Sequence, residues 1–273
     1  MAETTTPRYA QTVFVDGPVF TADTVRSRAH GVAVGAGRIM AVGGDEIRDL
    51  IGPATEVIDL AGKMLVPGFQ DAHVHPVMGG LTLGRCDLSS VHTEADYLDL
   101  IGAYAAAHPE LTWIRGANWA MSAFPGGTPL ATSLDRVTGD RPAFFPNRDG
   151  HGGWANSAAL RAAGIDRNTP DPADGRIERD ADGHPSGTLH EGAMSLLREV
   201  VPRADQATVD RALLAGQAYL HSYGITSWQD AIVGDYAELI DPGPAYVRAG
   251  QSGALTARVV GALWWDRAAG LGQ

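Results

Sequence analysis

Short apolar runs alternate with turn residues over the first part of the chain. The runs lie at 11–21, 31–43 and 56–66, and residue pairs or triplets containing Gly interrupt each of them. Strand-forming segments separated by such turns are typical of small β structures. The pattern therefore predicts a small antiparallel sheet over residues 1–64.

Beyond Met64 the pattern changes to strands that alternate with helices. Helical spacing of apolar residues and strand-like runs occur in turn at 94–108 (helix), 112–118 and 141–147 (strands), 156–165 and 207–223 (helices), and 224–229 and 255–265 (strands). Asn156 or Ser157 is placed to cap the second helix. Such alternation predicts a parallel α/β sheet, open or closed. Between these elements, the Pro-, Asp- and Gly-rich stretch 170–185 predicts a loop with a hairpin that pairs 176–179 with 186–189.

Composition narrows the classes of partner. The 273 residues are 44% hydrophobic and carry a formal net charge of −11. A basic surface for phosphate is therefore missing, and we expect neither nucleic acid nor an anionic membrane as partner. The chain has one cysteine, Cys86, so it cannot form an intrachain disulfide. With no signal-like start and no long apolar run, a cytoplasmic protein is the expectation.

The candidate chemistry lies in residues 66–76 (VPGFQDAHVHP). His73 and His75 are two apart at the end of an apolar run, and residues two apart in a strand point to the same face. Both imidazoles can then bind one divalent ion, for which zinc is a common choice. Asp71 has the same parity and could hold a histidine N–H that orients a metal-bound ring. Alone, a His-x-His pair also arises by chance.

The same segment resembles the first-strand signature of the amidohydrolase superfamily. Further stretches are similar to its amidohydrolase 3 branch, the YtcJ-like and N-substituted formamide deformylase-like proteins: 31–43 (GVAVGAGRIMAVG), 151–160 (HGGWANSAAL), 183–191 (GHPSGTLHE) and 224–228 (GITSW). The resemblance implies a TIM-type (β/α) barrel, here incomplete, preceded by a small β-sandwich segment. The implied domains are 1–64 for the sandwich segment and 65–273 for the partial barrel.

Residue by residue, the resemblance implies further site residues. Glu191 becomes a catalytic carboxylate, although an acid favoured at a helix start is an equal alternative. His151 and Trp154 become substrate contacts, although a solvated loop histidine and a core tryptophan are the structural alternatives. Asp230, which follows a strand, is a weaker candidate for an active-site contact.

The resemblance also implies the function. A bound divalent metal, expected to be zinc, would activate water to attack an amide-type substrate at its C–N bond. Two later histidines and a final aspartate belong to the family's site, yet no histidine follows His221. The chain therefore resembles the N-terminal portion of such an enzyme, which a homo-oligomer or a complementing chain would complete. The alternative is a truncated or degenerate copy that binds a small molecule or a partner without catalysis.

Overall fold

The computed structural model describes residues 8–25, 28–197, 200–235, 240–265 and 270. The chain divides into two compact units, Met1–Phe69 and Gln70–Gln273. The division falls a few residues from the predicted boundary at 64/65, and the domain assignment stays a prediction. No helix in the described ranges is both long and apolar enough to cross a membrane.

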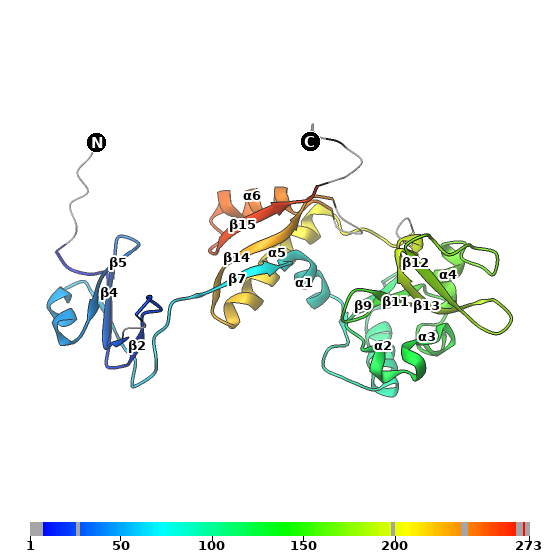
Figure 1. Cartoon of the computed structure of the whole chain (residues 1–273), viewed down its shortest axis with the longest axis horizontal. Helices are drawn as coiled ribbons and strands as arrows, with labels where there is room; N and C mark the ends of the chain where they lie inside the picture. The colour runs from blue at the N-terminus through cyan, green and yellow to red at the C-terminus, as the bar shows by residue number, and fades with distance from the viewer. Residues whose placement is uncertain (1–7, 26–27, 198–199, 236–239, 266–269, 271–273) are drawn as a thin grey trace. The chain divides into compact units, whose positions relative to one another are not determined.

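The N-terminal unit is built on a four-stranded sheet with the order β5-β4-β1-β6 (Figure 1). Its elements are β1 (Thr12–Val15), β4 (Gly31–Gly35), β5 (Arg38–Gly43), β6 (Glu56–Asp59) and the 3₁₀ helix η1 (Asp45–Leu50). A second pair, β2 (Val19–Phe20) with β3 (Arg28–Ala29), is antiparallel. The core on one face of this sheet includes Val13, Val15 and Ala33 from the strands and Ile47 from η1. The predicted sandwich character of this unit stays a prediction.

The expectation of a purely antiparallel sheet is wrong. The hairpin β4–β5 is antiparallel as predicted, but β6 pairs parallel with β1, with Val57 opposite Val13. The cause is η1, a helix that the strand-and-turn pattern does not predict. It leads the chain back to the end of the sheet where β1 begins, as the hydrogen bond from Ala10 N to Leu50 O shows.

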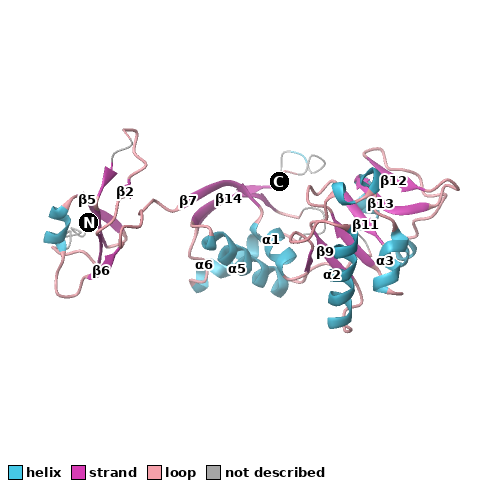
Figure 2. Cartoon of the chain, turned by 90° about the horizontal axis from the view of Figure 1, so that it is seen from below, coloured by secondary structure: helices cyan, strands magenta, loops and turns pink. Residues whose placement is uncertain are grey.

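The second unit contains two separate sheets. The smaller has the order β15-β14-β7, made of β7 (Phe69–Val74), β14 (Ile225–Val233) and β15 (Arg258–Leu263). Strands β14 and β15 are parallel. Helices α1 (Pro76–Leu83), α5 (Gln206–Ser222) and α6 (Gly243–Ser252) lie along this sheet on one side (Figure 2). On the outer strand β15, Val260 and Leu263 remain exposed.

The larger sheet has six strands in the order β12-β13-β11-β10-β9-β8. They are β8 (Cys86–Asp87), β9 (Ile114–Ala117), β10 (Ala143–Pro146), β11 (Gly152–Ala155), β12 (Gly175–Arg179) and β13 (Pro185–Glu191). The helices that accompany this sheet are α2 (Glu94–Ala107), α3 (Ala131–Thr138), α4 (Ser157–Ala162) and the 3₁₀ segments η2 (Met121–Ala123), η3 (Pro125–Gly127) and η4 (Gly192–Leu197). Asn156 caps α4 as predicted, accepting from Ala159 N at 2.8 Å.

Both faces of the six-stranded sheet are buried at its central strands β10 and β11. Consecutive residues of β10 show this, because Phe145 belongs to the core shared with α2 and α3, whereas Phe144 belongs to the core shared with α4 and η4. Likewise on β11, Trp154 belongs to the core shared with α2 and α3, and Ala155 belongs to the core shared with α4 and η4. Burying each large side chain stabilises the fold by about 1.5–3 kcal/mol.

This sheet corrects the interpretation of 112–118 and 141–147 as barrel strands. The two segments form β9 and β10, which are parallel, but β10, β11 and β13 then continue antiparallel. The sheet is inserted in sequence between β7 and β14, which are neighbours in the smaller sheet. A strand that is buried on both faces is apolar whether it belongs to a barrel or to an inserted sheet. The hydrophobic pattern therefore could not distinguish a barrel strand from a strand of the inserted sheet. The described residues therefore form a mixed α/β fold without a closed barrel.

Helices α1 and α5 approach each other at glycines. A Cβ on Gly80 would lie 1.8 Å from the carbonyl oxygen of Ala212, and one on Gly216 would lie 2.2 Å from the carbonyl oxygen of Pro76. Both obstacles are backbone atoms, which cannot rotate away as a side chain can. The close contact of the two helices therefore requires hydrogen at both positions.

We predict that Gly80→Ala and Gly216→Ala each destabilise the protein by at least about 1–3 kcal/mol, since overpacking forces the helices apart. Gly79→Ala is the matched control, because nothing lies within 4 Å of its added Cβ. Alanine favours the helix by up to about 1 kcal/mol over glycine, so the control should melt at the same or a higher temperature. Equal melting temperatures for all three variants, measured by circular dichroism, would contradict this packing.

The single thiol gives a second prediction. Cys86 is free and buried on β8, and burial, with a smaller effect of Asp87, raises the pKa of the thiol to about 12. Because the thiolate is the reactive form, iodoacetamide at pH 8 should label the native chain roughly a thousandfold more slowly than an ordinary thiol of pKa ~8.5. Mass spectrometry with and without urea measures the rate, and rapid stoichiometric labelling without urea would refute the burial.

Candidate metal centre

The predicted histidine pair lies where β7 meets α1. His73 is in the strand, and His75 is the N-cap residue of α1, with Pro76 in the first helical position. Proline suits that position because its fixed φ is helical and it has no N–H to satisfy. The ring centroids of His73 and His75 are 5.2 Å apart, with planes at 83°. The sequence thus folds so that two imidazoles lie together at the end of a strand.

His75 faces a buried carboxylate on the neighbouring strand. Its Nδ1 lies 3.8 Å from Oδ1 of Asp230 on β14, too far for a hydrogen bond. The Nδ1 atom is itself buried and has no hydrogen-bond partner. Asp230 is only 2% exposed. An orphaned buried ring nitrogen beside a buried acid is an uncommon arrangement, since buried polar atoms are normally paired.

Asp230 is held from two other directions. The hydroxyl of Tyr246 donates to Oδ2 at 2.8 Å, and the backbone N–H of Ile232 donates to Oδ1 at 3.2 Å. Burial raises the pKa of the Asp230 carboxyl, and these two donors and the nearby His75 offset part of that rise. Burial, together with the charge of Asp230, also raises the pKa of the Tyr246 hydroxyl. Tyr246 lies on α6 and carries no recognisable motif, which is why sequence alone missed it.

Asp71 makes a contact different from the expected one. Its Oδ1 accepts a hydrogen bond from the backbone N–H of His73 at 3.0 Å. This contact fixes the strand end that carries the imidazole, while an interaction with a histidine ring stays a prediction.

His151 and Glu191 come together across the pair β11–β13. The Nδ1 atom of His151 is 3.1 Å from both carboxylate oxygens of Glu191, and both side chains are largely exposed. The backbone N–H of Glu191 also donates to the carbonyl of His151 at 3.1 Å. Glu191 has a φ of 50°, which is uncommon for a residue with a Cβ. The hydrogen bond to Glu191 and the negative charge of Glu191 raise the pKa of the His151 imidazole.

Trp154 is fully buried, and its indole N–H donates to the carbonyl of Leu130 at 2.8 Å. It packs against Trp119, Phe124 and Phe145. The structure therefore places it in the core, the alternative that the sequence left open, and a substrate contact stays a prediction.

The predicted site residues thus form two groups. His73 and His75 join Asp230, whereas His151 joins Glu191 on the six-stranded sheet. Within the described residues, no hydrogen bond or ion pair connects the two groups. In the described part of the chain, no three His, Cys, Asp or Glu side chains are arranged to hold a metal ion.

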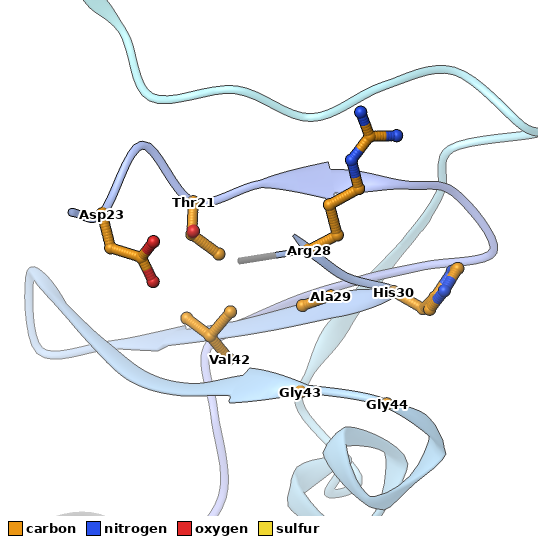
Figure 3. Close-up of a pocket in the computed structure, with 8 residues that line it drawn as sticks. All are labelled: Thr21, Asp23, Arg28, Ala29, His30, Val42, Gly43 and Gly44. Carbon is orange, nitrogen blue, oxygen red and sulfur yellow. The ribbon is translucent and has the colours of Figure 1, made fainter. Parts of the chain in front are cut away.

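A surface hollow of about 480 Å³ lies elsewhere, in the N-terminal unit (Figure 3). Asp23, Arg28 and His30 are among the residues that line it. It contains none of the predicted site residues, so it does not bear on the histidine pair.

Comparison with known proteins decides the family. A family model described as "Amidohydrolase family" matches residues 56–272, most of the chain. The chain belongs to the amidohydrolase family, in its amidohydrolase 3 branch. This confirms the resemblance carried by residues 66–76 and by the later motifs.

Individual relatives agree with this assignment. The N-substituted formamide deformylase of Arthrobacter pascens is 35% identical over 81% of this chain and 42% of its own length. YtcJ of Bacillus subtilis is 34% identical over 87% of this chain and 45% of its own length. An uncharacterized metal-dependent hydrolase from Pyrococcus furiosus shares the fold with a TM-score of 0.63 at 22% identity, over 92% of this chain and 50% of that one. The chain spans about half the length of these relatives.

The residues of this chain fit a metal in part. Two adjacent imidazoles suit zinc or a similar divalent ion, and the orphaned Nδ1 shows that His75 is not committed to a structural hydrogen bond. A zinc that activates water usually has three protein ligands. His73 and His75 would supply two of them, and Asp230 lies behind His75.

The contact between His151 and Glu191 gives a testable pKa. Glu191→Gln removes the charged acceptor, so the pKa of His151 should fall towards its ordinary value of about 6.5. In the wild type the protonated ring is favoured by folding, and the resulting stabilisation is lost as the pH rises through the raised pKa. NMR titration of labelled histidine measures the shift.

The matched control is Glu178→Gln, which alters a carboxylate bound to His190 instead and should leave the pKa of His151 unchanged. An unmoved His151 pKa in Glu191→Gln would show that the contact is not formed in solution.

Proposed function

We propose that this chain carries the first part of the active site of a metal-dependent hydrolase that cleaves amide-type C–N bonds. Family membership supports hydrolysis in general. The observation that carries the more specific proposal is the pair His73 and His75, brought to one strand end with rings 5.2 Å apart. Zinc is the ion we propose, because borderline divalent ions favour neutral imidazole.

The two imidazoles would hold the ion and leave coordination positions open. A divalent ion, when bound, lowers the pKa of water towards about 7 and polarises a substrate carbonyl. Asp71 holds the backbone of His73, and Pro76 starts α1 directly after His75. Both features fix the backbone that carries the two rings, which favours a preorganised site.

We further propose Glu191 as an active-site carboxylate, with His151 as its hydrogen-bonded neighbour. Support comes from their 3.1 Å contact and from the left-handed backbone of Glu191. A strained conformation at a polar, exposed pair is consistent with a functional position. Exposure of both side chains leaves them accessible to a substrate.

Additional ligands must complete the site. Since the relatives are about twice as long as the aligned region, we propose that they come from sequence corresponding to the rest of those proteins or from a complementing chain. The exposed Val260 and Leu263 on the outer strand β15 support such an addition, because apolar strand edges are normally covered. Small amides, including N-substituted formamides as suggested by the relative's name, are the proposed substrates.

Metal content tests the proposal directly. The wild type, loaded with Zn²⁺ and desalted, should retain more zinc than the double variant His73→Ala/His75→Ala, measured by elemental analysis. His92→Ala/His184→Ala is the matched control, since it removes two exposed histidines outside the site and should behave as wild type. Equal zinc in all three proteins would refute the assignment.

Turnover tests the completeness of the site. Residues 1–273 alone should hydrolyse formamides and other simple amides weakly or not at all, because two imidazoles leave the ion short of protein ligands. Robust turnover abolished by a chelator would show that the ligands of the site have been misplaced.

A further inference from the structure

Asp230 is a buried acid that the proposed chemistry does not use. Its side chain is 3% exposed and lies in the middle of the sheet β15-β14-β7. An ionisable group in such a place is costly unless it is paired. The fold retains it and places the Tyr246 hydroxyl on one oxygen and the Ile232 N–H on the other. These contacts fix the direction of the carboxylate.

The two nitrogens of the His75 ring have different surroundings. Nδ1 is sealed from solvent and lies 3.8 Å from Oδ1 of Asp230. The His75 side chain is nevertheless 30% exposed. The exposure therefore belongs to other atoms of the side chain, and Nε2 is the nitrogen free to meet an external ligand. Nδ1 can meet only the carboxylate.

We propose that Asp230 is a positioning residue for His75: it accepts the Nδ1–H of the ring and thereby presents Nε2 to the metal. This inference rests on the proposed metal site. Closing the 3.8 Å gap to a hydrogen bond requires a shift of about 0.8 Å. A carboxylate behind a metal-bound histidine fixes the tautomer and the ring orientation, and makes the ring a better ligand.

Two side chains in series, Trp228 and Tyr246, hold the carboxylate for this task. The indole N–H of Trp228 lies 3.3 Å from the hydroxyl of Tyr246, which in turn donates to Asp230. Trp228 and Asp230 are both on β14, and Tyr246 is on α6. Tyr246 thus holds Oδ2 from the helix side, while Oδ1, which also accepts the Ile232 N–H, faces His75.

The geometry favours positioning over direct coordination by Asp230. An ion between Nδ1 and Oδ1 would have to sit where the ring nitrogen is sealed. No group of three metal-binding side chains occurs in the described part of the chain, so Asp230 does not complete a triad with His73 and His75. Its role is therefore exerted through His75.

The tautomer of His75 in the metal-free protein is the first test. Long-range ¹H–¹⁵N NMR, at a pH where the ring is neutral, should find the proton on Nδ1 in the wild type. Asp230→Asn keeps the shape but loses the charge, and should shift the proton towards Nε2. Asp235→Asn, the same change at an exposed aspartate on the segment after β14, should leave the tautomer as in wild type. An Nε2–H tautomer in the wild type would overturn the proposal.

Zinc affinity, measured with Zn²⁺ alone by competition with a chelating dye, is the second test. Asp230→Asn should bind about 10- to 100-fold more weakly, and Tyr246→Phe, which frees the carboxylate but keeps its charge, should weaken binding less. Asp235→Asn should match the wild type. Unchanged affinity and tautomer in Asp230→Asn would overturn the role of Asp230 while leaving the histidine site intact.

A separate result would count against the site itself. If the wild type bound no zinc, or if His73→Ala/His75→Ala bound it equally well, the proposed function would fail. The tautomer of His75 would still decide whether the pairing with Asp230 exists. If zinc shifted the ¹⁵N resonance of Nδ1 in place of Nε2, the ion would sit between His75 and Asp230, and the positioning role would be wrong.

Discussion

The contact between α1 and α5 is the constraint on which the histidine site depends. The helices meet backbone to backbone at Gly80 and Gly216, where even a methyl group would collide with a carbonyl oxygen. Because α1 starts at Pro76, its position fixes the residue just before it, His75. Helix α5 leads directly into β14, which carries Asp230. One close helix contact therefore sets both partners of the His75–Asp230 pair.

The His75–Asp230 pair departs from the rules of a stable core. Nearly every buried polar group in a folded protein has a partner, yet the Nδ1 atom of His75 has none, and the acid facing it is desolvated. Local violations of this kind are expected at functional sites, where the surrounding fold compensates for them. Here the compensation comes from Tyr246 and the Ile232 N–H, which stabilise the carboxylate.

Sequence predicts well what depends on local spacing. The proximity of His73 and His75 follows from their spacing of two, the hairpin at 31–43 from its turn, and the helix after Asn156 from its cap. Membership of the amidohydrolase family also follows from such local motifs. Each depends on residues only a few positions apart, so the chemistry of the side chains determines the local geometry.

Sequence does not predict which strands become neighbours. Strand β10 is apolar on both faces, as a barrel strand would be, and only the structure shows that β9 and β10 belong to an inserted sheet. The same insertion separates His75 from Asp230 by more than 150 positions, so no spacing rule connects them. Tyr246 could not be found either, because its role arises from where α6 packs. These are tertiary contacts between residues that are distant in sequence.

The central claim is that one strand end binds a metal through two imidazoles. X-ray absorption at the zinc edge of the zinc-loaded chain tests it most directly. The account predicts scattering from two histidine rings with Zn–N distances of about 2.0–2.1 Å, and one ring fewer in His75→Ala. A zinc spectrum without imidazole scattering, or one identical in His75→Ala, would contradict the account.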